Sequence, residues 1–387
     1  MKGAVYWAPP ENRAYPLSTV AAHGGNSIRI GGNRLDALVA AAERLGLTVT
    51  IGIPMKKQRE GFDYDDEAAV RKQFEEARAI VMRHKDSPAT LIWGVGNELS
   101  HGNVADNTFT NLKVWNAVND IAKMIRELDP HHPAMTVIGT ASLRRGDIKA
   151  IIGRCPDLDL IGINSYRDIA EVPGWLARDG WTKPYLITEW GNDGSWQVKK
   201  TKWGAPIEAT TSEVAELMIR RYREPILKDE ARCLGSYAFF WQQAPWRTPT
   251  WYSFYLDSGE RLETANALQH IWTGQWPANR APQISPMTIN GERSSESVEV
   301  SPDSIHEAAV TVKDAEGDAL AYSWEIVADT TEGGDAYAGL AKTLLPDASG
   351  ATIPFKAPAQ PGPWRLFVYV RDGQGNVASA NFPFLVK

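Results

Sequence analysis

The chain has 387 residues, of which 43% are hydrophobic and 23% charged, and its formal net charge is −6. This length suits a barrel of roughly 250 residues followed by a smaller module. No apolar run approaches the ~18 residues of a membrane span, and Lys and Arg do not form the basic stripe of a nucleic-acid binder. We expect a monomer with no membrane span and no nucleic-acid partner, whose ligand is neutral.

The sequence contains two cysteines, Cys155 and Cys233, which cannot form a disulfide framework. We expect free buried thiols, with a single bridge as the alternative. At Met1 there is neither the charged region nor the apolar region of a signal peptide. We expect a secreted or periplasmic protein whose leader is missing from this sequence, with a cytoplasmic location as the alternative.

The first 280 residues alternate β-branched apolar runs with longer segments of helical period, which is typical of parallel strands joined by crossover helices. Eight strands are predicted, at residues 2–7, 27–31, 47–53, 90–95, 135–140, 159–164, 185–190 and 234–241. Eight such strands close most naturally into an α/β barrel, the (β/α)8 TIM barrel. Such barrels carry their chemistry at the C-terminal ends of the strands.

Apolar stripes of helical period predict helices at residues 34–45, 66–84, 108–128 and 262–273. In the first of these, Asn33 is expected to cap the N-terminus and Gly46 to end the helix in the left-handed conformation. Its stripe consists of Leu35, Leu38, Val39, Ala42 and Leu45.

Residues 276–282 read WPANRAP and interrupt this alternation with two prolines. Beyond them, short alternating strands are separated by turn signals such as Asp372-Gly373, a pattern that favours an immunoglobulin-like β-sandwich. We therefore expect a catalytic barrel over residues 1–278, a linker over 279–284 and a small all-β immunoglobulin-like domain over 285–387.

An acidic turn lies in this second domain, where Asp314, Glu316 and Asp318 alternate with other residues. Such a group can hold calcium, but acidic turns are more often simply solvated. We expect a solvated turn, with a calcium site as the alternative.

Two of the predicted strands end in a glutamate. Glu98 lies in TLIWGVGNELS after the fourth strand, and Glu189 lies in KPYLITEWG at the end of the seventh. Cleavage of a glycosidic bond uses two carboxyl groups, of which one protonates the leaving oxygen and the other attacks the sugar or activates water. The pair predicts an enzyme that cleaves sugars.

With Asn97-Glu98 after strand four and Glu189 at strand seven, residues 2–275 resemble the clan A retaining glycoside hydrolases, in particular the catalytic barrels of family 2. The resemblance implies that Glu98 is the general acid/base and Glu189 the nucleophile. It implies further roles for four residues: Asn97 binds the sugar 2-hydroxyl, Arg29 pairs with the nucleophile, Tyr166 donates to the nucleophile, and Trp241 forms an aromatic platform under the sugar.

Other candidates for substrate contact rest on position alone. Asn164 faces the same side of strand six as Tyr166. Fifteen tryptophans are present, and a surplus of indole rings suits a cleft that stacks sugars. The remaining candidates follow barrel strands, where cleft walls are built: Trp7, His101, Trp196, Trp203, Trp246 and Trp251.

The main hypothesis is a retaining β-glycoside hydrolase acting on a β-linked glucan or oligosaccharide. A transglycosylase, such as a β-glucanosyltransferase, would use the same two glutamates and is the first alternative. The second is a non-catalytic carbohydrate-binding protein. No nucleophilic serine elbow, HExxH motif or metal-spaced Cys/His set is present, so we expect catalysis without a cofactor or metal. Because the expected sandwich follows the barrel, whereas family 2 enzymes carry such domains before it, an open cleft and endo action become credible.

Overall fold

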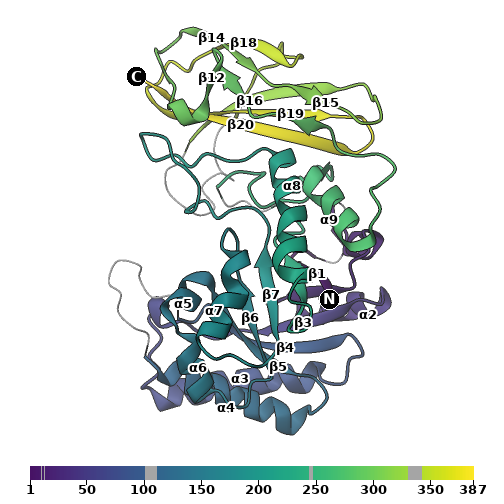
Figure 1. Cartoon of the computed structure of the whole chain (residues 1–387), viewed down its shortest axis with the longest axis vertical. Coiled ribbons are helices and arrows are strands. Elements are labelled where there is room, and N and C mark those ends of the chain that lie inside the picture. The colour runs from purple at the N-terminus through teal and green to yellow at the C-terminus, as the bar shows by residue number, and fades with distance from the viewer. Residues whose placement is uncertain (10, 13, 101–110, 244–246, 330–341) are drawn as a thin grey trace. The chain divides into compact units, whose positions relative to one another are not determined.

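The structure, a computed structural model of the whole chain, describes residues 1–9, 11–12, 14–100, 111–243, 247–329 and 342–387 (Figure 1). The chain divides into two compact units. The first comprises Met1–Asn12, Pro16–Trp190 and Arg221–Phe239, and the second comprises Arg13–Tyr15, Gly191–Arg220 and Phe240–Lys387. Segments that we assigned to the barrel domain, Gly191–Arg220 and 240–278, thus belong to the second unit. The domain limits expected from the sequence remain a prediction.

The first unit contains a closed barrel of eight strands in sequential order, and every neighbouring pair is parallel. This confirms the predicted strand count and order. The strands are β1 Lys2–Val5, β2 Ser27–Ile30, β3 Thr48–Ile53, β4 Thr90–Asn97, β5 Ala134–Gly139, β6 Leu160–Asn164, β7 Tyr185–Trp190 and β8 Cys233–Ala238. Strands β5, β6 and β7 are buried along their whole length, which explains their continuous apolar sequences.

Two of the register shifts between barrel strands fall near the C-terminal ends of the strands. Between β4 and β5 the shift falls between Gly94 and Asn97, and between β6 and β7 it falls at Asn164. Such irregularities re-aim side chains and are frequent next to active sites. They lie at the ends that carry the predicted catalytic residues.

Helices surround the barrel strands in the first unit: α1 Ser18–Ala22, α2 Leu35–Arg44, α3 Glu67–His84, α4 Lys113–Leu128, α5 Thr140–Arg145, α6 Ile148–Arg154 and α7 Val172–Arg178. Three shorter helical segments accompany them, the 3-10 turns η1 Gln58–Glu60 and η2 Ile169–Glu171 and the π-helix η3 Tyr222–Leu227. Helix α8 (Thr211–Arg221) runs across the boundary between the units.

Helix α2 tests the expected capping. Arg34 takes the N-cap position and no side chain caps the helix, so the expectation for Asn33 was wrong. Gly46 has φ +67 directly after the last turn, which confirms its left-handed conformation. Leu45 is exposed rather than part of the buried stripe, because it lies in the C-cap, where the helical period ends.

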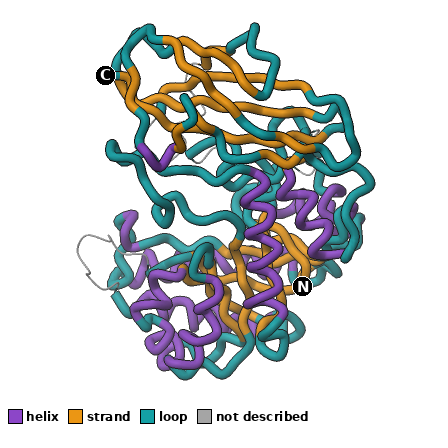
Figure 2. The backbone as a smooth tube through the Cα atoms, turned by 45° about the horizontal axis from the view of Figure 1, so that its top comes forward, coloured by secondary structure: helices purple, strands orange, loops and turns teal. Residues whose placement is uncertain are grey.

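The second unit contains further sheets, drawn as orange strands in Figure 2, in which most neighbouring strands are antiparallel. Its sheets have the orders β12-β11-β14-β18, β13-β20-β19-β16-β17 and β10-β15, and β9 pairs with β20. The strands are β9 Arg261–Leu262, β10 Gln283–Ile284, β11 Thr288–Ile289, β12 Glu292–Arg293, β13 Glu299–Val300, β14 Ile305–Ala309, β15 Val312–Lys313, β16 Ala321–Ala328, β17 Lys342–Leu344, β18 Thr352–Lys356, β19 Gly362–Arg371 and β20 Asn376–Val386. This unit also holds the 3-10 turn η4 Ser294–Glu296 and helix α9 Glu263–Thr273, close to the predicted helix at 262–273.

The two larger sheets of the second unit share one hydrophobic core. Ile289 and Phe355 enter it from one sheet, and Trp324, Val368 and Phe382 enter it from the other. Two sheets that bury a common face form a two-layer β arrangement. The immunoglobulin-like class remains a prediction.

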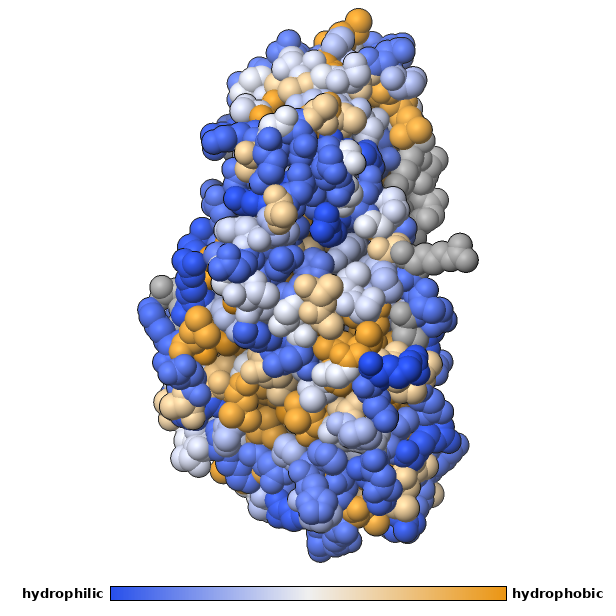
Figure 3. Space-filling model, turned by 90° about the vertical axis from the view of Figure 1, so that its right-hand side faces the viewer, coloured by the Kyte–Doolittle hydropathy of each residue, from blue (hydrophilic) through white to orange (hydrophobic). Residues whose placement is uncertain are grey.

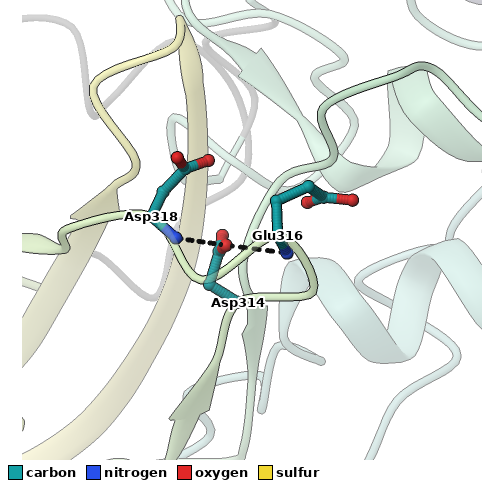
Figure 4. A group of neighbouring side chains, drawn as sticks. All are labelled: Asp314, Glu316 and Asp318. Atoms are coloured by element: carbon teal, nitrogen blue, oxygen red, sulfur yellow. Dashed lines mark hydrogen bonds between the residues drawn. The ribbon is translucent and has the colours of Figure 1, made fainter.

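The acidic turn between β15 and β16 is closed by one of its own side chains. Asp314 Oδ1 accepts hydrogen bonds from the backbone N–H groups of Glu316 (3.1 Å) and Asp318 (2.9 Å), as Figure 4 shows. These hydrogen bonds show that the Asp314 side chain stabilises the turn, which explains an acidic residue at this position. The carboxylates of all three residues approach one another to within 4.8 Å, so the calcium alternative stays open.

The remaining general expectations concern thiols and membrane. Cys155 and Cys233 are both buried and unbridged, as expected.

Among the helices in the described parts of the chain, none combines the length and apolarity that a membrane crossing requires. The face shown in Figure 3 is largely hydrophilic, with hydrophobic residues exposed in groups among the hydrophilic ones.

Candidate active site

Arg29 joins three barrel strands at their C-terminal ends. From β2 its Nη1 donates to Glu189 Oε1 on β7 (2.8 Å) and to the Thr188 carbonyl (3.1 Å). Its Nη2 donates to Asn97 Oδ1 at the end of β4 (2.8 Å). A buried guanidinium requires such partners, because an unpaired charge away from water is costly. The contact fixes the position of both the arginine and the Glu189 carboxylate.

Tyr166 holds the other oxygen of the same carboxylate. Its hydroxyl donates to Glu189 Oε2 over 2.9 Å. The phenol ring packs edge-on against Phe239, with centroids 6.2 Å apart. Each oxygen of Glu189 therefore has a donor, and the carboxylate cannot rotate freely.

Asn164 connects this group to Glu98. Its Nδ2 donates to Glu98 Oε1 (3.0 Å) and to Asn97 Oδ1 (3.1 Å), while its own Oδ1 accepts from Thr188 Oγ1 (2.8 Å). The threonine thereby sets the orientation of the amide. Glu98 and Glu189 are linked through Asn164, Asn97 and Arg29 into one polar network drawn from β2, β4, β6 and β7.

The amide of Asn97 is oriented by two donors. Because Arg29 and Asn164 both donate to Oδ1, the Nδ2 group faces elsewhere. Among the residues that the structure describes, no acceptor lies within hydrogen-bond distance of this Nδ2. Asn97 can thus donate to an oxygen of a bound ligand.

The backbone at the end of β4 has an unusual conformation. Gly96 has φ +72 and Glu98 has φ +52, a left-handed conformation that is uncommon for residues other than glycine. The Glu98 N–H still donates to the Val137 carbonyl on β5 (2.8 Å). Strained conformations of this kind cluster at functional sites, where the surroundings hold them in place.

The electrostatic environment of Glu189 contains opposing effects. Burial raises the pKa of its carboxyl above the ordinary value of 4.5. The positive charge of Arg29 lowers this pKa, the negative charge of Glu98 raises it, and the hydrogen bonds from Arg29 and Tyr166 lower it. The two donors therefore favour the ionised form of this carboxyl, whereas burial favours the protonated form.

A cavity of about 380 Å³ opens beside this network, within the range typical of small-molecule sites. Arg29, Asn97 and Glu189 contribute to its wall. Trp7, at the end of β1, also lines it; the indole is 37% exposed and packs edge-on against Phe239. The structure thus brings Trp7 together with the predicted catalytic group.

Other predicted contacts lie elsewhere or outside the described residues. His101 and Trp246 fall outside the residues that the structure describes. Trp241 is buried in the second unit, where its ring stacks on Trp272 with centroids 5.7 Å apart. Trp251 is buried in the same unit, and its Nε1 donates to the Asp193 carbonyl (2.9 Å). Their roles as sugar platforms remain predictions.

Sequence reasoning missed two residues of this region. Thr188, which orients Asn164, precedes Glu189 directly, and its position on the catalytic strand could have drawn attention to it. Lys57 lines the cavity from the loop after β3. The lysine follows the strand by four residues, and the sequence of that loop contains no motif that indicates a site.

A comparison with family models places this geometry in context. The model for cellulase, glycosyl hydrolase family 5, matches residues 18–212, which is half of the chain and contains both glutamates. The chain belongs to glycosyl hydrolase family 5. Family 5 is a clan A family, so the expected clan holds, whereas the model that matches is that of family 5 and not of the expected family 2. No curated protein sequence matches this family 5 chain.

Solved structures resemble the family 5 chain at low sequence identity. Bacteroides uniformis beta-glucuronidase 2, covalently bound to cyclophellitol-6-carboxylate aziridine, matches with a TM-score of 0.51 and 14% identity over 95% of this chain and 42% of that chain. A Bacteroides fragilis protein proposed to be a beta-galactosidase matches with a TM-score of 0.51 and 11% identity over 99% of this chain and 54% of that chain. The family 5 chain therefore spans about half the length of these proteins. Similarity at this level supports the fold alone.

Proposed function

We propose that this family 5 chain is a retaining β-glycoside hydrolase that cleaves a β-linked glucan or oligosaccharide, with Glu189 as the nucleophile and Glu98 as the general acid/base. The single observation that carries the proposal is the buried network in which Arg29 and Tyr166 bind both oxygens of Glu189 while Asn164 binds Glu98. Two carboxyl groups in different surroundings, joined at the ends of β4 and β7, suit division into a nucleophile and an acid.

In the first step, a Glu189 oxygen attacks the anomeric carbon while Glu98 gives its proton to the leaving glycosidic oxygen. A covalent glycosyl-enzyme forms and the first product leaves. In the second step, Glu98 takes a proton from water, the water oxygen attacks the anomeric carbon, and the bond to Glu189 breaks. Asn97 Nδ2 would donate to the sugar 2-hydroxyl, a contact that strengthens as positive charge develops on the sugar.

Azide rescue tests both roles. We expect Glu189→Ala and Glu98→Ala to lose nearly all activity on an activated aryl β-glycoside. Added azide should then give the α-glycosyl azide with Glu189→Ala and the β-glycosyl azide with Glu98→Ala, because azide replaces the nucleophile in one variant and water in the other. Glu171→Ala, at an exposed glutamate on η2, serves as the matched control. Identical azide products from the two variants would contradict the assignment.

Transglycosylation is the first alternative, since a sugar hydroxyl can replace water in the second step. Longer oligosaccharides early in the reaction would indicate transfer. Full binding of oligosaccharides without any turnover would instead indicate a non-catalytic binding protein. The proposal also retains the expectations of a secreted or periplasmic location, a monomeric state, and an immunoglobulin-like second domain.

A further inference from the structure

The cavity beside Glu189 contains a lysine that the proposed reaction does not use. Lys57 follows β3 by four residues and lines the same cavity as Arg29 and Glu189. Only 20% of its side chain is exposed. A half-buried lysine in a cavity wall can lay its aliphatic stem along apolar surface and direct its ammonium group to a ligand.

The ionic partner of Lys57 is weak. Within the described residues, its Nζ has one carboxylate neighbour, Glu60 Oε1 at 4.0 Å. The Glu60 side chain is 61% exposed, and a pair at that distance in water contributes little. The loop that carries Lys57 therefore supplies no strong counter-charge to the ammonium group.

The charges in the cavity wall show the same imbalance. Three ionisable side chains contribute to the wall as described, and two of them, Arg29 and Glu189, bind each other at 2.8 Å. Lys57 is the third and adds a positive charge. The lack of a clustered Lys/Arg stripe led us to expect a neutral ligand, but charge in a concave site acts locally and need not follow the pattern of the whole protein.

The loop that carries Lys57 is anchored on both sides of this residue. Lys56 N–H donates to Gln73 Oε1 on α3 (2.7 Å), and the Tyr64 hydroxyl donates to the Lys56 carbonyl (2.6 Å). The Lys57 carbonyl accepts from Glu60 N–H (2.9 Å). The backbone of Lys57 is therefore placed before any ligand binds, which reduces the entropy lost on binding.

The remainder of this wall admits a sugar close to the backbone. Apart from Asn97, it consists of apolar side chains and of glycines, among them Gly31 and Gly52 next to the ends of β2 and β3. Gly52 has no room for a side chain, because a Cβ there would come within 2.9 Å of the Ile30 carbonyl oxygen. Gly31 and Gly52 thus leave backbone, and no side chain, at this part of the wall.

We infer that Lys57 binds an anionic substituent of the sugar next to Glu189, so that the preferred substrate is a glycoside carrying a carboxylate, sulfate or phosphate group. This inference rests on the proposed function, because it assigns the substrate class of the same cavity. The shared chemistry is an anionic oxygen that accepts a charge-assisted hydrogen bond from the ammonium group.

Binding and turnover test the inference separately. Calorimetry compares D-glucose with D-glucuronate and D-galactose with D-galacturonate, on the full chain and on Lys57→Gln and Lys56→Gln. Lys56 is the matched control, since its ammonium lies over the Phe62 ring and not in the cavity wall. The matched aryl β-glycosides, together with 6-sulfated and 6-phosphorylated sugars, provide the turnover arm and distinguish the three anions.

We expect at least one anionic sugar to bind about tenfold or more tightly than its neutral counterpart, and this preference to shrink with added salt. Lys57→Gln should abolish the preference and Lys56→Gln should retain it. The inference would be overturned if neutral and anionic sugars bound equally or if no anion bound. An unchanged preference in Lys57→Gln would also overturn it. A Lys57-dependent preference without any turnover would leave the inference standing and reject the proposed hydrolase.

Discussion

Arg29 Nη1 lies 2.8 Å from Glu189 Oε1, and each side chain has only 11% of its surface exposed. An ion pair this far from water is held by geometry, because the loss of hydration is offset only when both partners are well bonded. Here the guanidinium makes two further contacts, to the Thr188 carbonyl and to Asn97 Oδ1. One cation thus positions the proposed nucleophile and the amide beside the proposed acid.

Replacing Arg29 should therefore damage stability and activity together. We expect Arg29→Met to lower the free energy of unfolding by about 3–5 kcal/mol, because the buried Glu189 carboxylate loses its counter-charge. Arg29→Lys retains the charge but loses the planar guanidinium that donates to several acceptors at once. We therefore expect kcat/KM to fall by about tenfold or more, with a smaller loss of stability. Urea denaturation and steady-state kinetics measure the two effects, and the exposed Arg44→Met is the control. Full activity in Arg29→Met would exclude the proposed site.

The pH dependence of activity should reflect the raised pKa of Glu189. The nucleophile must be ionised, so kcat/KM should fall as pH decreases through a pKa above 4.5. The free energy of unfolding should depend on pH in the opposite direction. Because the pKa of Glu189 is higher in the folded than in the unfolded chain, protonation of Glu189 stabilises the folded state. This contribution is complete below pH 4.5 and is lost as pH rises through the folded-state pKa.

Tyr166→Phe provides a check on that pH profile. The change removes a donor that favours ionised Glu189, so the acid limb of kcat/KM should move to higher pH. Tyr322→Phe, on β16 of the second unit, should leave the limb in place. A shift to lower pH in Tyr166→Phe would argue against this electrostatic arrangement.

Gly96 permits the backbone turn that carries Asn97 and Glu98. A Cβ at this position would lie 2.6 Å from Leu99 Cδ1, and its φ is +72. We expect Gly96→Ala to lower stability by about 2–4 kcal/mol, which combines left-handed strain with overlap, and to lower kcat by displacing Glu98. Gly46→Ala shares a positive φ of +67 but meets nothing within 4 Å, so it should lose only about 1 kcal/mol. Similar losses in both variants would show that overlap with Leu99 is unimportant.

Glu208 should be a main determinant of stability in the second unit. Its buried carboxylate accepts from Thr248 Oγ1, Thr250 Oγ1 and Asn381 Nδ2, each over 2.7 Å. Glu208→Ala leaves three donors without their acceptor, and we expect a loss of at least about 3 kcal/mol in thermal or urea unfolding. The exposed Glu216→Ala should change stability by no more than about 0.5 kcal/mol. A loss of that smaller size in Glu208→Ala would mean that water replaces the carboxylate.

The barrel could be predicted because its strands are buried on both faces. Runs such as β5 and β7 are mostly apolar and buried along their whole length, and helix α4 follows a clear apolar stripe. The glutamates at the ends of β4 and β7 were identifiable for the same reason, since a carboxylate directly after an apolar strand stands out. Arg29 also stood out, as a charge inside an apolar strand that needs a partner.

Other features depend on contacts between distant segments. The role of Asn164 rests on hydrogen bonds to Asn97 and Thr188, which come from two other strands. Lys57 has no sequence signal, because only the path of its loop brings it to the cavity wall. The expected cap at Asn33 failed since side-chain capping needs a geometry that residue type alone does not specify.

The strands β20 and β10 form hydrogen bonds with the segment that follows β7 in the chain. Asn381 binds Glu208, the Ser379 N–H donates to Thr211 Oγ1 (3.1 Å), and Ile284 N–H donates to Ser212 Oγ (2.8 Å). For anyone designing a shortened gene, a stop codon at the proline-containing segment 276–282 is therefore a poor place to cut. The shortened polypeptide would retain Glu208 and Thr211 but lose the strand that binds them, so expression trials should begin from a gene that includes β20.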